Sequence, residues 1–387
     1  MNGSAADRRP SLLGICTLPP WPVRDGYSLR VFHILRELAR SWTITLIAPE
    51  QAQLGALVPE IIAAHVPVRL EGRGLTYPWR FEQTALRAAL DDAIVRHRPD
   101  RALVWPGAEA QWFGRRDLPP AVMDMIDCNT LEFCRSAMQA VGPRRRVYRL
   151  REAAVATVYA ARTLRSFAAT ICVGEQDARW LRPFGPRARV HVVPNGVEIP
   201  ADVPGEDPTP TLSFVGTLDY APNVHAARYA AEAIWPRIRA SIPDARFVIA
   251  GRDPVPAVSE LALLPGIEVR ANVPDMADVL GRSWVSIAPM RSGVGIKNKV
   301  LEAWACGRPV VMTPLATNGL QLPEGHRALV HTRPDQLAAS VVALLTDPAA
   351  RRAFGRSALG SVRANATWAA AAARIDTLLR DSLPLPP

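Results

Sequence analysis

The chain has 387 residues, of which 49% are hydrophobic and 21% are charged, and its formal net charge is +10. This hydrophobic content supports buried cores in two or more domains and excludes a disordered chain. The positive charge favours an anionic partner, and nucleic acid ranks last because neither a zinc-finger spacing nor an aromatic-basic RNA-binding signature occurs.

The cysteines and the apolar runs indicate the cellular compartment of the protein. The five cysteines are scattered and form no C-x-x-C motif, which predicts a reduced, cytoplasmic protein rather than a disulfide framework. No apolar run approaches the length of a membrane span, and we interpret the short run at 11–18 as a first strand rather than a signal peptide.

The first half of the chain alternates short apolar runs with segments of helical periodicity. We expect strands at 11–17, 43–48, 65–70, 101–105, 121–126, 170–173 and 190–193. We expect helices at 28–40, with Ser28 as N-cap, and at 81–97, 129–140 and 143–167. This alternation predicts an α/β domain with a parallel sheet over residues 1–197.

Ligands of such sheets lie beyond the carboxyl ends of the strands, where Gly26 and Asp127 fall. Gly26 also fits an ordinary loop glycine. Asp127 also fits the N-cap of the following helix.

A proline-rich, acidic stretch at 198–210 predicts a linker, after which the alternation resumes. We expect strands at 212–215, 247–250, 266–270, 284–290, 310–313 and 328–331 of a second domain, 211–366. Asn223 is the expected N-cap of a helix that continues to 239. The remaining segment, 367–387, contains a last helix that we expect to return to the first domain.

The sequence R-S-G-V-G-I-K-N-K-V-L-E-A-W-A-C-G at 291–307 follows an apolar run and precedes another. Strand, glycine-rich turn, helix and strand form one crossover unit, whose turn offers backbone N–H groups and a positive helix end to an anion. Gly307 falls where a glycine ends a helix.

Only two of the 46 Lys and Arg residues are lysines, Lys297 and Lys299, and both lie beside these glycines. A compact ammonium suits a phosphate, which favours phosphate binding. The alternative is a surface pair of Lys299 with Glu302, worth roughly 0.2–0.5 kcal/mol.

Five arginines crowd the start of the helix expected at 143–167: Arg144, Arg145, Arg146, Arg149 and Arg151. They fit a solvated face. They also fit docking on an anionic membrane surface, where each basic residue contributes about 1 kcal/mol.

Four segments now carry a resemblance to a known family. They are F-V-G-T-L-D-Y-A-P-N at 214–223, A-G-R-D-P at 250–254, V-V-P-N-G-V at 192–197 and the lysine-containing segment. The chain resembles glycosyltransferase family 4, the retaining nucleotide-sugar transferases with two Rossmann-like domains whose parallel sheets face across a cleft (GT-B). The wording G-I-K-N-K-V-L-E-A-W-A-C-G-R-P-V-V resembles a branch tied to bacterial exopolysaccharide and exosortase systems.

The resemblance implies a hexosyltransferase that moves a sugar from a nucleotide-sugar donor to a hydroxyl of a lipid-linked or saccharide acceptor. It implies no cofactor and, with no D-x-D triplet in the sequence, no metal. A cytoplasmic protein is expected, peripheral on the inner face of the plasma membrane.

The resemblance also implies residue roles around the donor. Glu302 would bind the ribose hydroxyls, since a carboxylate accepts two O–H bonds. Gly293 and Gly295 would lie near the diphosphate or sugar, Gly216 would allow close backbone approach, and the base would pack near Val273. The loop at 19–30, which contains Gly26, looks like the family's donor-side loop.

The sequence departs from the family pattern at two places. Val294 stands where the first of two glutamates is usual, and the usual Arg and Lys after the first strand of the second domain are absent, with Thr217 and Asn223 nearby. Asn223 therefore joins the expected donor-binding set.

We assign neutralisation of the diphosphate to Lys297 or Lys299, helped by Arg291 or Arg252. Lys299 and Arg291 are accordingly the catalytic candidates, with Asp127 as a polar or basic group on the acceptor side. Two other functions stay open: a nucleotide-sugar 2-epimerase and a non-catalytic nucleotide-binding component of a polysaccharide assembly complex.

Overall fold

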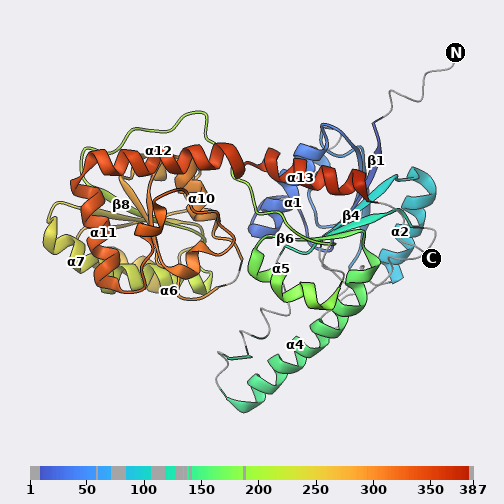
Figure 1. Cartoon of the computed structure of the whole chain (residues 1–387), viewed down its shortest axis with the longest axis horizontal. Coiled ribbons are helices and arrows are strands. Elements are labelled where there is room, and N and C mark those ends of the chain that lie inside the picture. The colour runs from blue at the N-terminus through green and yellow to red at the C-terminus, as the bar shows by residue number, and fades with distance from the viewer. Residues whose placement is uncertain are drawn as a thin grey trace. The chain divides into compact units, whose positions relative to one another are not determined.

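The computed structural model describes residues 9–57, 60–70, 84–105, 118–126, 134, 137–138, 142–185, 189–293 and 295–382 (Figure 1). The chain forms two compact units. Unit 1 comprises Met1–Pro194 and Trp368–Pro387, and unit 2 comprises Asn195–Thr367. The stretch 198–210, expected as a linker, is counted with unit 2 in this division.

Unit 1 contains a seven-stranded parallel sheet of order β3-β2-β1-β4-β5-β6-β7. Its strands are β1 (Ser11–Ile15), β2 (Thr43–Pro49), β3 (Ala64–Val68), β4 (Arg101–Val104), β5 (Ala121–Asp124), β6 (Ala169–Cys172) and β7 (Val190–Val192). The helices are α1 (Gly26–Leu38), α2 (Thr84–His97), α4 (Pro143–Thr163), α5 (Glu175–Leu181) and α13 (Trp368–Asp381). Most of the strands are apolar and buried on both faces, as parallel sheets covered by helices require.

The start of α1 corrects one sequence prediction. The N-cap is Asp25 rather than Ser28, because the Asp25 carboxylate accepts a hydrogen bond from the Ser28 backbone N–H at 2.8 Å. The Ser28 hydroxyl in turn accepts from the Asp25 backbone N–H at 3.0 Å, which completes a capping box. The helix therefore begins at Gly26.

The last helix, α13, packs against α1 within unit 1. The His33 and Trp368 rings stack with centroids 4.8 Å apart, and the Trp42 indole N–H donates to the Asp376 carboxylate at 2.5 Å. These contacts bring the C-terminal segment back to the domain in which the chain began (Figure 1).

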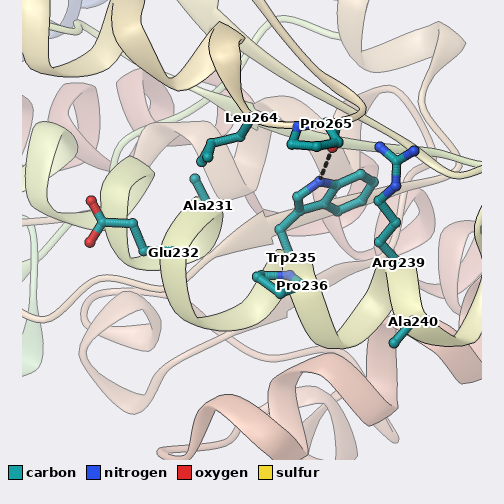
Figure 2. Close-up of a pocket in the computed structure, with 8 residues that line it drawn as sticks. All are labelled: Ala231, Glu232, Trp235, Pro236, Arg239, Ala240, Leu264 and Pro265. Carbon is teal, nitrogen blue, oxygen red and sulfur yellow. Dashed lines mark hydrogen bonds between the residues drawn. The ribbon is translucent and has the colours of Figure 1, made fainter.

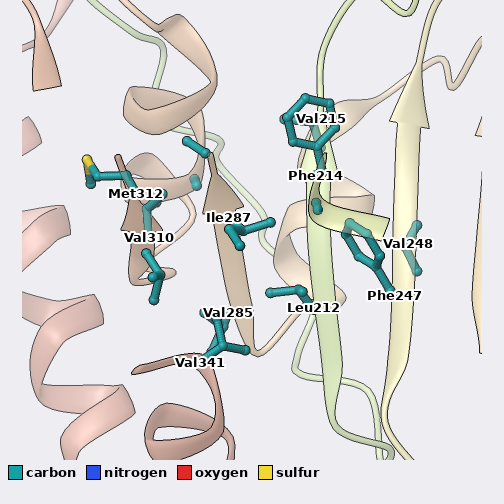
Figure 3. Close-up of a cluster of buried hydrophobic side chains, with 14 of the residues drawn as sticks. Leu212, Phe214, Val215, Phe247, Val248, Val285, Ile287, Val310, Met312 and Val341 are labelled. Carbon is teal, nitrogen blue, oxygen red and sulfur yellow. The ribbon is translucent and has the colours of Figure 1, made fainter. Parts of the chain in front are cut away.

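Unit 2 contains a five-stranded parallel sheet of order β10-β9-β8-β11-β12. Its strands are β8 (Thr211–Val215), β9 (Arg246–Gly251), β10 (Ile267–Ala271), β11 (Val285–Ala288) and β12 (Val310–Met312). The helices are α6 (Ala221–Tyr229), α7 (Trp235–Ser241), α8 (Pro256–Ser259), α9 (Met276–Arg282), α10 (Asn298–Ala305), α11 (Pro334–Thr346) and α12 (Pro348–Asn365). Figure 3 shows side chains of adjacent strands, among them Phe214, Phe247 and Ile287, together in the buried core.

One further prediction for unit 2 is wrong. Asn223 is not an N-cap, because α6 begins two residues earlier at Ala221, where Pro222 suits the first turn. The helix expected to run to 239 does continue that far, since α6, a π-helical turn at Ala230–Ile234 and α7 follow one another without a break. The π turn lies just before Pro236, which has no N–H for the helical ladder.

The strand predicted at 328–331 is also wrong. The chain forms a 3₁₀ turn, His326–Leu329, and only Val330 makes an isolated bridge, to Met312. Gly325, in the left-handed region with φ +78°, starts this turn, and Leu329 is buried in the core. Burial of a few apolar residues looks the same in a short strand and in such a turn.

Gly307 ends α10 as the sequence predicts. It has φ +69°, its N–H donates to the Trp304 carbonyl at 3.0 Å, and the Arg308 N–H donates to the Ala303 carbonyl at 2.9 Å. This pair of bonds is the Schellman motif, which satisfies carbonyls left open at a helix end.

We predict opposite effects for two Gly→Ala variants of unit 2. Gly307→Ala lowers the free energy of unfolding by about 1–2 kcal/mol, because a Cβ is strained in the left-handed region. Gly360→Ala, in the exposed interior of α12 with nothing within 4 Å of the new Cβ, raises it by about 0.5–1 kcal/mol. Urea denaturation compares them, and equal shifts for the two variants would contradict the assignment.

Candidate functional site

The strand order of unit 2 reverses between β8 and β11. Neighbouring strands whose connections run to opposite sides form a switch point, and ligands of open α/β sheets bind there, beyond the carboxyl ends. The loop after β8 begins with Gly216, and the loop after β11 contains Gly293 and Gly295. Most residues of the predicted donor site therefore lie at this edge.

The ammonium of Lys299 extends from α10 to the loop after β8. It donates to the Asn223 side-chain oxygen at 2.8 Å and lies 4.0 Å from the centroid of the Phe214 ring. The Asn223 amide donates to the Thr217 carbonyl at 2.9 Å, which holds the same side chain against the loop. A loop and two helices thus meet at one ammonium group.

Gly216 leaves the space that this arrangement needs. Its φ is +153°, and a Cβ would lie 2.8 Å from the Lys299 ammonium nitrogen and 2.9 Å from the Asn223 amide nitrogen. At Gly251, which ends β9, a Cβ would lie 1.7 Å from the Gly216 carbonyl oxygen. Both positions exclude a side chain, so the loop approaches the sheet edge closely.

Lys297 lies in the turn that precedes α10, with 7% of its surface exposed. Its ammonium donates to the Gly295 carbonyl at 2.9 Å. A Cβ on Gly293 would lie 3.8 Å from that ammonium and 3.2 Å from Pro222 of α6. The two lysines therefore do not compete for a helix face, since only Lys299 belongs to the helix.

Burial controls the charges of this cluster. Desolvation lowers the pKa of Lys299 to about 7, the Glu302 carboxylate acts to raise it, and Lys297 lowers it further. Burial also raises the pKa of Glu302, one helical turn along α10, against the opposite effect of Lys299. An anion bound here would stabilise the charged form of Lys299.

The surface pair of Lys299 with Glu302, which the spacing also allowed, does not form. Both side chains are partly buried, and Lys299 donates to Asn223 instead. Over the described residues, no hydrogen bond or ion pair within 4.0 Å reaches the Glu302 carboxylate. Its oxygens can therefore accept hydrogen bonds from a ligand.

The other predicted residues are more dispersed. Arg252 is half-buried after β9, and its carbonyl accepts from the Leu218 N–H at 2.7 Å. Arg291 is exposed, with its guanidinium 4.9 Å from the centroid of the Tyr229 ring. Val273 is half-buried after β10 and packs against the core.

Two of the remaining candidates belong to unit 1. Gly26 is the first residue of α1 in that unit. Asp127, the proposed acceptor-side residue, lies outside the described residues, as does Val294 of unit 2.

Sequence reasoning missed two contributors to the site. The Asn195 amide donates to the Asn298 side-chain oxygen at 3.1 Å, at the first residue of α10. Phe214 lies against the Lys299 ammonium. Asn195 belongs to the quoted P-N-G turn, which could have marked it, whereas the strand position of Phe214 indicates only burial.

The described residues include no group of three His, Cys, Asp or Glu side chains that could hold a metal ion. Within the same ranges, every helix is too short or too polar to cross a membrane.

A cavity of about 630 Å³ lies elsewhere in unit 2 (Figure 2). Its lining residues are Ala231, Glu232, Trp235, Pro236, Arg239, Ala240, Leu264 and Pro265. Because α7 leads into β9 and Pro265 precedes β10, this cavity is at the amino edge of the sheet. The Trp235 indole N–H already donates to the Pro265 carbonyl at 3.0 Å. It is not the candidate donor site.

Residues 209–347, most of unit 2, match the family model of glycosyl transferases group 1. No curated protein sequence matches the chain.

Solved structures resemble the whole chain at low identity. HepE of Anabaena, in complex with UDP and glucose, is 12% identical with a TM-score of 0.66 and covers 96% of this chain and 99% of its own. WaaG, a glycosyltransferase involved in lipopolysaccharide biosynthesis, is 14% identical with a TM-score of 0.66 and covers 95% and 99%. A glycosyltransferase from Rickettsia africae is 11% identical with a TM-score of 0.71 and covers 96% and 98%. The predicted α/β fold of two Rossmann-like units with parallel sheets, the GT-B fold, is confirmed.

We predict that the buried lysine makes stability depend on pH. The pKa of Lys299 is about 7 in the folded protein against 10.5 for a free lysine. Between these values the unfolded chain binds more protons, so the unfolding free energy rises with pH. Relative to Lys299→Met, wild type should gain stability from about pH 7 to about pH 10, by at most about 1.4 kcal/mol per pH unit. Denaturation of both proteins over this range measures the difference, and a constant difference would refute the low pKa.

Proposed function

We propose that the protein is a glycosyltransferase that moves a sugar from a nucleotide-sugar donor to a hydroxyl acceptor. The observation that carries the proposal is the Lys299 ammonium, held by Asn223 at the switch point of unit 2. The family match over the same unit and the UDP and glucose bound by HepE support it.

The leaving diphosphate needs fixed positive charge as the glycosidic bond breaks. We assign this role to Lys299 and Lys297, since one ammonium is beside the β8 loop and the other is within the glycine turn. Binding of a diphosphate would replace, at Lys299, part of the solvation lost by burial. Arg252, after β9, and Arg291, after β11, are the candidate helpers, and Arg291 would have to leave the Tyr229 ring.

Glu302 is assigned to the ribose hydroxyls. A carboxylate accepts two O–H bonds at once, and its place one turn after Lys299 allows both residues to meet one nucleotide. Gly216, Gly293 and Gly295 admit the diphosphate and sugar close to the backbone, and the backbone near Val273 would bind the base.

Finer features belong to the same proposal. They are retention of configuration, a hexose donor, membership of family 4 and of its exosortase-associated branch, and a part in exopolysaccharide or glycolipid synthesis. The acceptor would be lipid-linked or a saccharide, with Asp127 on its side. We further propose a metal-independent protein located in the cytoplasm, peripheral on the inner membrane face.

Turnover measured in EDTA tests the activity. A thermal-shift screen of nucleotide sugars first selects the donor, because a ligand that binds only the folded state raises its stability. The proposal predicts a glycosylated acceptor and a released nucleoside diphosphate. Epimerised sugar without acceptor would show the epimerase instead, and binding without turnover would show a non-catalytic component. Activity lost in EDTA and restored by Mg²⁺ would contradict metal independence.

We predict that Glu302→Ala weakens nucleoside diphosphate binding by roughly 1.5–3 kcal/mol, because it removes a charged hydrogen-bond acceptor. Glu324→Ala, which changes an exposed glutamate of the same unit, is the matched control and should bind as wild type. Titration calorimetry measures both affinities. Equal affinities of the two variants would remove Glu302 from the site.

We predict that Lys299→Arg lowers turnover at least tenfold, about 1.4 kcal/mol of transition-state stabilisation, and that Lys297→Arg has a similar effect. The Lys299 ammonium lies 2.8 Å from the Asn223 side-chain oxygen and 4.0 Å from the Phe214 ring centroid. A larger, planar guanidinium should fit less well between these groups and cannot act as the same point charge. Arg246→Lys, an exposed change of cation at the start of β9, is the control. Wild-type kinetics in both Lys→Arg variants would show that the lysines do not hold the diphosphate.

A further inference from the structure

Helix α4 of unit 1 carries an exposed apolar stripe. Val147, Leu150 and Val158 are 66%, 51% and 52% exposed, and Ala154 between them is exposed as well. Spacings of three and four residues place all four on one face of the helix. The stripe, defined as Val147, Leu150, Ala154 and Val158, covers about 16 Å of the helix at 1.5 Å per residue.

The opposite face of α4 is the one that packs on the protein. Glu152, Ala156 and Ala160 are buried, and each follows a stripe residue by two positions. Two positions turn an α-helix by about 200°, so the two sets point in opposite directions. The stripe is therefore not the face that packs on the core of unit 1, because the opposite face of α4 does so.

The arginine cluster borders this stripe. Arg146 and Arg151 stand one turn from Leu150 and Val147 respectively, and Arg144 and Arg145 are exposed in the first turn. Glu152 is the one acidic residue in the sequence of α4, and it lies on the buried side. Figure 1 shows the first turns of α4 extending away from the sheet of unit 1.

We propose that the exposed face of α4 docks on an anionic lipid bilayer, with the stripe in the interface and the arginines on the headgroup phosphates. An apolar face bordered by basic residues is the pattern of helices that lie in a membrane surface. The charge of this face favours a bilayer over a second copy of the chain, because headgroup phosphates carry the opposite charge to the arginines whereas a second α4 carries the same charge. The docking gives a surface for the peripheral membrane location proposed above and rests on that part of the proposed function. It does not depend on the enzymatic activity, so flotation and turnover can fail separately.

Vesicle flotation of the full chain tests the proposal. The probes are vesicles of phosphatidylcholine alone and of equal parts phosphatidylcholine and phosphatidylglycerol, at low and at physiological salt. Wild type should float with the anionic vesicles only, less at physiological salt, where exposed charges are screened beyond about 8 Å.

Two variants separate the stripe from the arginines. Val147→Ser with Leu150→Ser should lower partitioning at physiological salt at least tenfold, because the apolar contribution is lost. Arg144→Gln with Arg145→Gln should reduce the preference for anionic vesicles. Both changes are exposed, so thermal melts should match wild type.

Matched controls come from unit 2. Leu263→Ser changes a side chain that is 85% exposed, and Arg352→Gln with Arg356→Gln changes exposed arginines of α12. Both controls should float as wild type.

The proposal is overturned if wild type does not float with anionic vesicles at low salt, or floats equally with neutral ones. It is equally overturned if the stripe variant floats as wild type, since the arginines alone would then act. A wild-type dimer in light scattering that the stripe variant abolishes would identify a second copy as the occupant and also overturn it.

Discussion

The candidate site depends on one partly buried ammonium group. At the switch point the Lys299 ammonium loses hydration. In place of water it contacts the side-chain amide oxygen of Asn223 and the face of the Phe214 ring. These replace only part of its hydration, and the pKa of Lys299 falls to about 7 as a result. The site is therefore suited to an anionic ligand, because an anion beside the ammonium would provide the stabilisation of its charge that the protein groups do not.

The rest of unit 2 fixes this group in place. The adjacency of β8 and β11 puts the two loops side by side. Gly216 leaves room for the Lys299 ammonium and the Asn223 amide, and Gly251 allows the Gly216 carbonyl to approach the end of β9 closely. Helix α10 packs on the core through its buried face, which includes Trp304, and ends at Gly307. Its orientation directs Lys299 towards the β8 loop and leaves the Glu302 carboxylate with no hydrogen bond or ion pair within 4.0 Å among the described residues.

Local patterns predicted most of the fold. Apolar runs located the strands to within a few residues, because a strand buried on both faces is continuous in hydrophobicity. Gly307 was predictable because a helix end needs a left-handed residue. The rarity of lysine singled out Lys297 and Lys299, in a chain where every other basic residue, histidine aside, is arginine, and the structure puts Lys299 against the loop after β8.

The predictions that failed concern positions where two residues could take the same role, or contacts between residues far apart in the sequence. Asp25 caps α1 in place of Ser28, because both residue types can cap a helix. Asn223 does not cap α6, because its side-chain amide bonds the Thr217 carbonyl and the Lys299 ammonium. No local pattern reports that Lys299 crosses to another strand's loop. Local patterns do not predict the buried ion pair of Arg30 with Asp124 either, since the two residues are 94 positions apart in the sequence. Their side chains are 2.8 Å apart and have no exposed surface.

We propose that the Lys299 ammonium binds the diphosphate of the donor, and the sequence itself provides a clean probe. With only two lysines, protein labelled with ¹³C at the lysine ε-carbons gives two side-chain signals, which Lys297→Arg and Lys299→Arg assign. Their pH titration with and without UDP measures both pKa values directly. We expect a pKa of about 7 for Lys299 without ligand and a higher pKa when UDP binds, because an adjacent anion favours the charged form. An unchanged Lys299 titration at saturating UDP would contradict it.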